Sequence, residues 1–161
     1  MRGFAYAART EFAPARSDFD SFTELAGKVG NPVMLAHADD SLACLAVIMG
    51  DPTPEDRARV PRSIQRFRRI SNYACLGHGI YTAAAWLAAE GRLEDAARSL
   101  GVVQALRDRL TMVVPPYEDR TFVVEGAGLD PLDIAVRARE FDAGRSMQPE
   151  AGIDWVVTTF G

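Results

Sequence analysis

Residues 31–50 read NPVMLAHADDSLACLAVIMG, and residues 72–91 read NYACLGHGIYTAAAWLAAEG. With an offset of 41 residues the two segments share five positions: Asn31/Asn72, Leu35/Leu76, His37/His78, Ala43/Ala84 and Gly50/Gly91. Each segment has the length and apolar content of a helix and ends at a glycine. Self-similarity at this period indicates stacked helical pairs, because one pair alone cannot bury its apolar face.

The composition is that of one ordinary globular domain, with 48% hydrophobic and 25% charged residues. The net charge of −4 argues weakly against nucleic acid as the main partner. Cys44 and Cys75 form no metal-binding or redox motif, which favours a reducing cytoplasm and no cofactor. The longest apolar runs are shorter than a membrane span, and no signal peptide is recognised, so we expect no membrane association.

Apolar periodicity and capping residues predict an all-α chain. Ser17 is expected to cap the first full helix, and Pro61 is expected to kink or break a later one. Residues 1–16 resemble the remnant of a preceding repeat, with Phe4, Tyr6 and Phe12 lacking partners. The helices are expected at 17–29, 32–49, 54–70, 73–90, 92–110, 117–125, 130–144 and 149–155. The buried stripes are expected to be Leu76, Ile80, Ala83 and Leu87 in 73–90, and Ile134, Ala138 and Phe141 in 130–144.

One segment resembles a known family. Residues 91–110 read GRLEDAARSLGVVQALRDRL, and Pro115-Pro116 and Gly144-Arg145 follow. This pattern resembles the C-terminal tetratricopeptide-like region of bacterial LuxR- and AfsR-type regulators and of ATPase-linked adenylate-cyclase-like signalling proteins. The resemblance implies a short right-handed stack of tetratricopeptide-like helical hairpins with a C-terminal helical cap. We see neither a P-loop nor a cyclase domain, so no enzymatic or DNA-binding role is carried over to any residue.

The expected organisation is a single helical-repeat domain over residues 1–161. Residues 1–16 are the possible remnant of a preceding repeat, 17–91 hold the repeat pairs, and 92–157 hold the capping helices. The chain is then a stand-alone remnant or a fragment of a regulator, acting as a non-catalytic interaction module. Because the end of a repeat array is apolar, we expect a second copy or a partner protein to cover the N-terminal end.

The equivalent faces of the two repeated helices predict a concave groove that suits a peptide or protein partner. Its expected lining comes from four positions on each helix: His37, Asp40, Cys44, Val47, His78, Tyr81, Ala85 and Ala88. The alternative is that these side chains are solvated or covered by the C-terminal helices. A small-molecule or metal sensor at His37 and His78 also stays open, although the spacing of His37, Asp40 and Cys44 is not a recurrent ligand pattern.

Four arginines lie along one face of helix 54–70: Arg59, Arg62, Arg66 and Arg69. Such a stripe can bind nucleic acid or an acidic protein, but it is more often a solvated face, and no aromatic residues interleave for base stacking. Asp39 lies where the second repeat has Ile80, and we expect a slight rotation of the helix to bring it to solvent. Ser99 lies inside an amphipathic helix rather than on a strand-to-helix turn, which excludes a hydrolase elbow.

Overall fold

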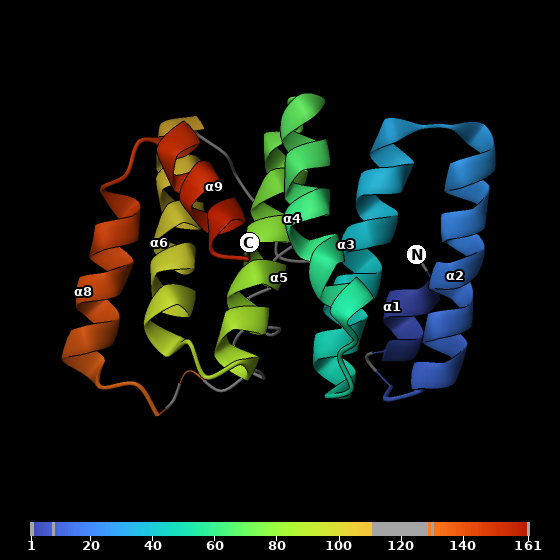
Figure 1. The fold of residues 1–161 in the computed structure, drawn as a ribbon, viewed down its shortest axis with the longest axis horizontal. Coiled ribbons are helices and arrows are strands. Elements are labelled where there is room, and N and C mark those ends of the chain that lie inside the picture. Colours follow the sequence, from blue (N-terminus) through green and yellow to red (C-terminus); the bar gives the residue numbers. More distant parts are fainter. Residues whose placement is uncertain (1, 8, 111–128, 130, 161) are drawn as a thin grey trace.

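The computed structural model describes residues 2–7, 9–110, 129 and 131–160, and this part of the chain is all-helical. Figure 1 shows the helices side by side in a row, with α2 at one end and α8 at the other. The prediction of an all-α chain is therefore confirmed, and the helix expected at 117–125 lies outside the described residues. The helices are α1 (Arg2–Ala7), α2 (Phe12–Val29), α3 (Pro32–Met49), α4 (Pro54–Arg69), α5 (Tyr73–Ala89), α6 (Leu93–Leu110), α8 (Ile134–Arg145) and α9 (Pro149–Thr158).

The two repeated segments form α3 and α5, and the repeated asparagines cap them. The side chain of Asn31 accepts hydrogen bonds from the amides of Val33 and Met34, at 2.9 and 3.2 Å. Asn72 accepts one from the amide of Cys75 at 3.2 Å. Side-chain acceptors at this position satisfy amides that have no partner inside the helix. The terminal glycines Gly50 and Gly91 have φ angles of 69° and 76°, a backbone conformation that would be strained for a residue with a side chain.

The helix α4 starts at a capping box and continues through a proline. The Thr53 hydroxyl accepts from the amide of Asp56 at 3.1 Å, and the Asp56 carboxylate accepts from the amide of Thr53 at 3.4 Å. Of the kink or break expected at Pro61, the break does not occur, because α4 runs through this residue from Pro54 to Arg69. Val60 and Ile64 on either side are fully buried, and we attribute the continuity to this packing.

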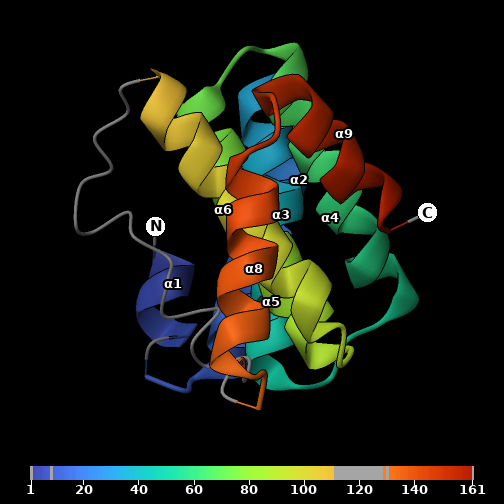
Figure 2. The ribbon, with the colours of Figure 1, turned by 90° about the vertical axis from the view of Figure 1, so that its left-hand side faces the viewer.

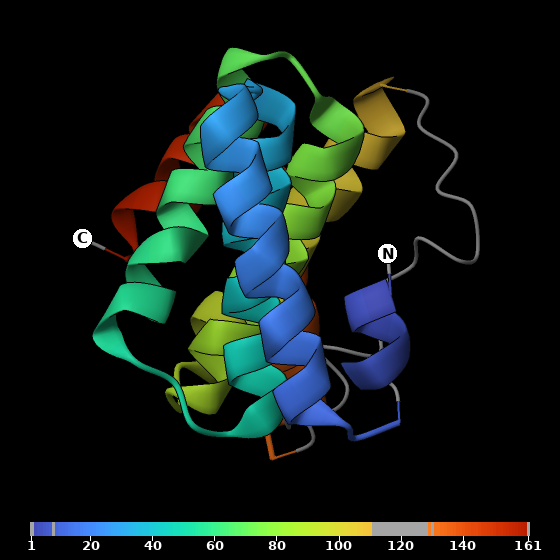
Figure 3. The ribbon, with the colours of Figure 1, turned by 90° about the vertical axis from the view of Figure 1, so that its right-hand side faces the viewer.

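The N-terminal residues form part of the fold, and the prediction that they lack partners is wrong. The helix α2 begins at Phe12 instead of Ser17, since Pro14 lies in the first turn, where a missing N–H costs little. The helix α1 lies beside α2 (Figure 3). The ring of Phe4 packs edge-on against Phe19, with centroids 5.0 Å apart. A second apolar cluster results, composed of Ala7, Ala15, Phe19, Leu42 and Leu45 with Phe4, Tyr6 and Phe12 at its margin.

The core of the molecule surrounds α5. The predicted stripe of Leu76, Ile80, Ala83 and Leu87 is confirmed, because all four are fully buried. The opposite side is buried as well, including Tyr81, Ala85 and Ala88, since α3, α4, α6 and α9 all contact α5. A helix that is apolar on all sides belongs inside a core rather than at a surface.

The helix α3 is long and apolar enough to cross a membrane by length and composition alone. In this structure 56% of that segment is buried inside the protein, and α2, α4 and α5 pack against it. It also carries the buried carboxyl groups of Asp39 and Asp40, which would be costly in lipid. These features are those of a core helix of a globular domain.

The helix α8 packs against α6 through two glycines. A Cβ atom at Gly101 would lie 2.0 Å from the carbonyl oxygen of Phe141, and one at Gly144 would lie 2.0 Å from that of Arg98. The two backbones are therefore in direct contact. The predicted apolar stripe of α8 is wrong, because Ile134 is 85% exposed and Ala138 is also exposed. Close backbone packing at Gly144, and not an apolar stripe, orients α8. The half-buried Phe141 lies beside Gly101 of α6.

The helix α9 packs against α4, α5 and α6 (Figures 1 and 2). Arg68 of α4 pairs with Asp154 and Glu150 of α9, at 2.6 and 2.7 Å. Arg57 of α4 donates to the carbonyl of Phe160 just after α9, at 2.8 Å. The helix α9 thus contacts α4, α5 and α6.

The glycine contact predicts a large difference between two kinds of Gly→Ala substitution. Gly101→Ala or Gly144→Ala should destabilise the protein by about 1–3 kcal/mol, because the added methyl group meets backbone that cannot move locally. Gly77→Ala is the control, since its Cβ would meet only a Val103 methyl group at 4.0 Å. It should stabilise α5 by about 0.5–1 kcal/mol through helix propensity. Urea unfolding measures both effects, and equal stability of the three variants would contradict this account of the α6–α8 contact.

Candidate functional site

The predicted groove residues do not form one open surface. Asp40, Cys44 and Ala85 have no exposed surface, and Tyr81 and Ala88 are 5% and 6% exposed. His37, Val47 and His78 are partly buried. The two repeated helices are neighbours, as expected, but the faces assigned to the groove are largely covered because α5 is surrounded by other helices.

Several of these residues hold α3 and α5 together. The Thr82 hydroxyl donates to the buried carboxylate of Asp40 at 2.8 Å. The Trp86 indole N–H donates to the carbonyl of Ala43 at 2.9 Å. Each bond satisfies a polar group that would otherwise be costly to bury. Asp40 therefore belongs to the contact between the repeats.

The two equivalent histidines have different surroundings. His37 Nε2 lies 3.5 Å from the Sγ atom of Cys75 on α5. Its ring also packs edge-on against Phe67 of α4, with centroids 5.0 Å apart. His78 instead lines a hollow between α5 and α6. No group of three or more His, Cys, Asp or Glu side chains suited to a metal ion occurs among the described residues.

The arginine face of α4 is organised around Asp39. Asp39 is only 3% exposed, so the prediction that it reaches solvent is wrong. Arg62 forms two hydrogen bonds with its carboxylate at 2.9 and 3.0 Å, and Arg66 and Arg59 contact the same carboxylate. The bonds to Asp39 raise the pKa of the Arg62 guanidinium. Arg69 is exposed and lies outside this network.

Acidic residues of α4 compensate the remaining charge of this face. Glu55 pairs with Arg62 at 2.9 Å and with Arg59 at 3.7 Å, and the hydrogen bond from Arg62 lowers the pKa of Glu55. The buried Asp56 lies 3.6 Å from Arg59. Three of the four arginines on the predicted face are therefore committed to carboxylates of the chain itself, which leaves little free positive charge for a partner.

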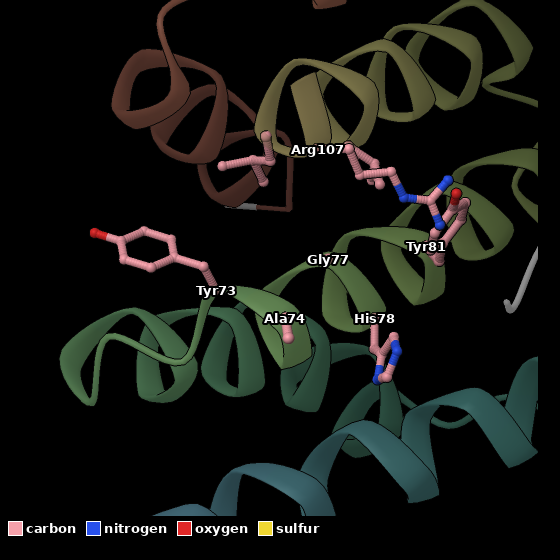
Figure 4. A pocket seen from close by; sticks show the side chains of 8 residues that line it. Tyr73, Ala74, Gly77, His78, Tyr81 and Arg107 are labelled. Carbon is pink, nitrogen blue, oxygen red and sulfur yellow. The ribbon is translucent and has the colours of Figure 1, made fainter. Parts of the chain in front are cut away.

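A small hollow lies between α5 and α6; it has a volume of about 10 Å³, room for about one water molecule, and it is partly open to solvent. Figure 4 shows the guanidinium group of Arg107 from α6 beside the ring of Tyr81 from α5. The guanidinium carbon lies 5.1 Å from the ring centroid, within the range of a cation–π contact. The hollow is lined by Tyr73, Ala74, Gly77, His78, Tyr81, Val103, Leu106 and Arg107.

Sequence reasoning identified His78 and Tyr81 but missed Arg107 and Gly77. Arg107 follows Val103 by four residues, so the two lie on one face of α6. That spacing was visible in the sequence, but nothing there indicated that this face of α6 meets the end of α5 carrying Tyr73, Gly77 and Tyr81. The hollow also depends on the missing side chain at Gly77, which sequence reasoning treated only as part of the apolar helix.

The chain was compared with known proteins at three levels. It matches no protein-family model, no curated protein and no solved structure.

The Asp39 network predicts a large effect of one substitution. Asp39→Asn should lower the free energy of unfolding by about 3 kcal/mol, because it leaves Arg59, Arg62 and Arg66 without their shared counter-ion. Glu55→Gln removes an exposed carboxylate from the same network and should change stability little. Chemical unfolding of both variants measures the difference. Equal effects would show that Asp39 is not the centre of the network.

Proposed function

We propose that the protein is a non-catalytic interaction module of a regulatory or signalling system, which binds a peptide segment of a partner protein at the hollow between α5 and α6. The observation that carries this proposal is the hollow itself, with Tyr73, Tyr81 and Arg107 in its wall. Tyrosine and arginine are enriched among the residues that dominate binding energy at interfaces. A shallow, partly open apolar hollow with a few polar groups beside it can take the tip of one side chain.

The arrangement of the repeats supports a tetratricopeptide-like array. The antiparallel helices α3 and α4 contact each other, as do α5 and α6, and the equivalent helices α3 and α5 are adjacent. The Thr82–Asp40 and Trp86–Ala43 bonds join them at offsets of 42 and 43 residues, close to the sequence repeat of 41. The bacterial regulatory setting is suggested by the resemblance of residues 91–116 alone.

The other two functions considered have weaker support. A sensor that uses both histidines is disfavoured because His37 contacts Cys75 and Phe67, whereas His78 lines the hollow. A binder of nucleic acid or acidic protein on the arginine face is disfavoured because Asp39 neutralises much of that face. Peptide binding at the hollow uses surface that no described helix covers.

A blocked hollow tests the proposal. Peptides are selected from a random display library on the wild-type protein and then measured against Gly77→Leu and Gly27→Leu. A Cβ atom at Gly77 would meet only Val103, at 4.0 Å, so we expect a leucine there to reach into the hollow, and circular dichroism checks that α5 stays folded. Gly27 is an exposed helical position with nothing near its added Cβ, so Gly27→Leu is the matched control. We expect Gly77→Leu to weaken binding at least about tenfold and the control to leave it unchanged.

Three outcomes of this selection would contradict the proposal. If the library yields no binders, the hollow does not recognise peptides. If the selected peptides bind Gly77→Leu as tightly as the wild type, their site lies elsewhere. If both leucine variants lose binding equally, the effect is not local to the hollow.

A second candidate function is self-association at the α2 end. Leu25 and Val29 lie one turn apart on α2 and are 51% and 59% exposed. Val33, in the first turn of α3, is 39% exposed and follows the same helix junction. Neighbouring exposed apolar side chains favour burial against another surface. This feature supports the expectation that a second copy covers the N-terminal end, with Leu25, Val29 and Val33 as the contact.

Sedimentation at increasing concentration tests self-association. We expect the wild type to form dimers at micromolar concentration and Val29→Glu to remain monomeric, because a charge at an apolar contact is costly. Ile134→Glu is the control, because Ile134 is 85% exposed on α8. It should behave as the wild type does. A monomeric wild type would rule out this function.

A further inference from the structure

We infer that the partner segment presents a carboxylate, which pairs with Arg107 in the hollow between α5 and α6. This inference rests on the proposed function, because it names the chemistry that the hollow recognises. Arg107 supplies a positive charge in a wall that is otherwise aromatic, aliphatic or histidine.

The charge of Arg107 is not compensated within the described part of the chain. No described carboxylate lies within ion-pair distance of its guanidinium, and its Nε atom is buried without a hydrogen-bond partner. Other arginines of this region are engaged: Arg92 with Asp95, Arg98 with Glu140, and Arg109 with Gln148. Arg107 as a whole is only half-buried, so a carboxylate that pairs with the outer N–H groups of its guanidinium would neutralise its charge.

The contact with Tyr81 positions the guanidinium group and leaves its donors available. In a cation–π contact the positive charge is attracted to the face of the ring, and no N–H group is used as a hydrogen-bond donor. The planar guanidinium can then present its N–H groups to a carboxylate, a geometry that favours two parallel hydrogen bonds. Tyr81 therefore acts as a support that fixes Arg107 before a ligand arrives.

The nearest acidic residue along α6 does not compete for Arg107. Asp108 accepts hydrogen bonds from Gln104 at 2.7 Å and from Arg145 at 2.8 Å. These two bonds lower the pKa of Asp108, the Gln104 bond most strongly, so its carboxylate stays ionised and committed to them. No carboxylate of the described residues is therefore left for Arg107, and an external carboxylate would supply its counter-ion.

A carboxylate suits the hollow better than a phosphate does. A phosphate with two negative charges is usually bound by several cationic or amide donors. Here a single arginine lines the hollow together with the apolar side chains of Val103 and Leu106, beside which the stem of a glutamate or of a C-terminal residue can lie. Both sources share the same carboxylate chemistry, and the experiment distinguishes them.

The test combines a change in the protein with a change in the ligand. The probes are the peptides selected on the wild type, each also made with its acidic residues replaced by the corresponding amides, or with an amidated C-terminus. Arg107→Gln is compared with Arg137→Gln, which removes the same charge from an exposed position on α8. We expect Arg107→Gln to weaken binding about tenfold or more and Arg137→Gln to weaken it less than about twofold.

The amide peptides make the test independent of any effect of Arg107→Gln on folding. On the wild type, loss of the essential carboxylate should weaken binding about tenfold. On Arg107→Gln the same change should have almost no further effect, because the two groups act as a pair. Side-chain amidation identifies an aspartate or glutamate as the source, and C-terminal amidation identifies the chain end.

The outcomes separate this inference from the proposed function. Peptides that lose binding to Gly77→Leu but bind Arg107→Gln normally would overturn the carboxylate inference and leave peptide binding in place. Amide peptides that bind the wild type as well as the acids would overturn it in the same way. Peptides insensitive to Gly77→Leu, or a selection without binders, would overturn both.

Discussion

Burial of the helix α5 on all its sides is the constraint on which the rest of the structure depends. From Leu76 to Ala88 every residue of α5 except His78 is buried. Four helices contact it: α3, α4, α6 and α9. Its many alanines let these neighbours approach closely, and the hydrophobic effect favours the arrangement because apolar area leaves water on every side. The hollow lies beside the first half of α5, where Ala74 is exposed and Tyr73 and His78 are partly buried.

Charged side chains connect the outer helices to this core. Asp39 gathers three arginines of α4, Arg68 joins α4 to α9, and Arg98 pairs with Glu140 between α6 and α8. Most of the arginine content of the described helices is thus used for contacts between helices. Against this background an arginine without a carboxylate partner among the described residues, such as Arg107, is informative, because the same helices satisfy so many others.

The sequence predicted the helices well and their surroundings less well. Asn31, Asn72, Gly50 and Gly91 act locally, through caps and left-handed turns, so their roles could be read from the repeat. The solvent exposure of Asp39 was predicted incorrectly, because its partners lie on a different helix, twenty or more residues away. The prediction of which face of α8 is buried was wrong for a similar reason. The orientation of α8 follows from backbone contact at Gly101 and Gly144, and such a contact needs no stripe of apolar side chains that a sequence pattern could reveal.

The candidate site was half predicted, and the physical reason lies in how the two copies differ. Ala36 and Ala38 of the first copy correspond to Gly77 and Gly79 of the second. The space at Gly79 is taken by α4, since a Cβ there would lie 3.0 Å from Ile64. At Gly77 an added Cβ would meet only Val103, at 4.0 Å. A glycine inside a helix destabilises it relative to alanine. At Gly79 close packing against α4 offsets that cost, but at Gly77 the described helices provide no such packing. A ligand bound in the hollow would offset the cost of the glycine at position 77. This is a reason to place ligand binding beside Gly77 and Arg107 instead of at the matching position of α3.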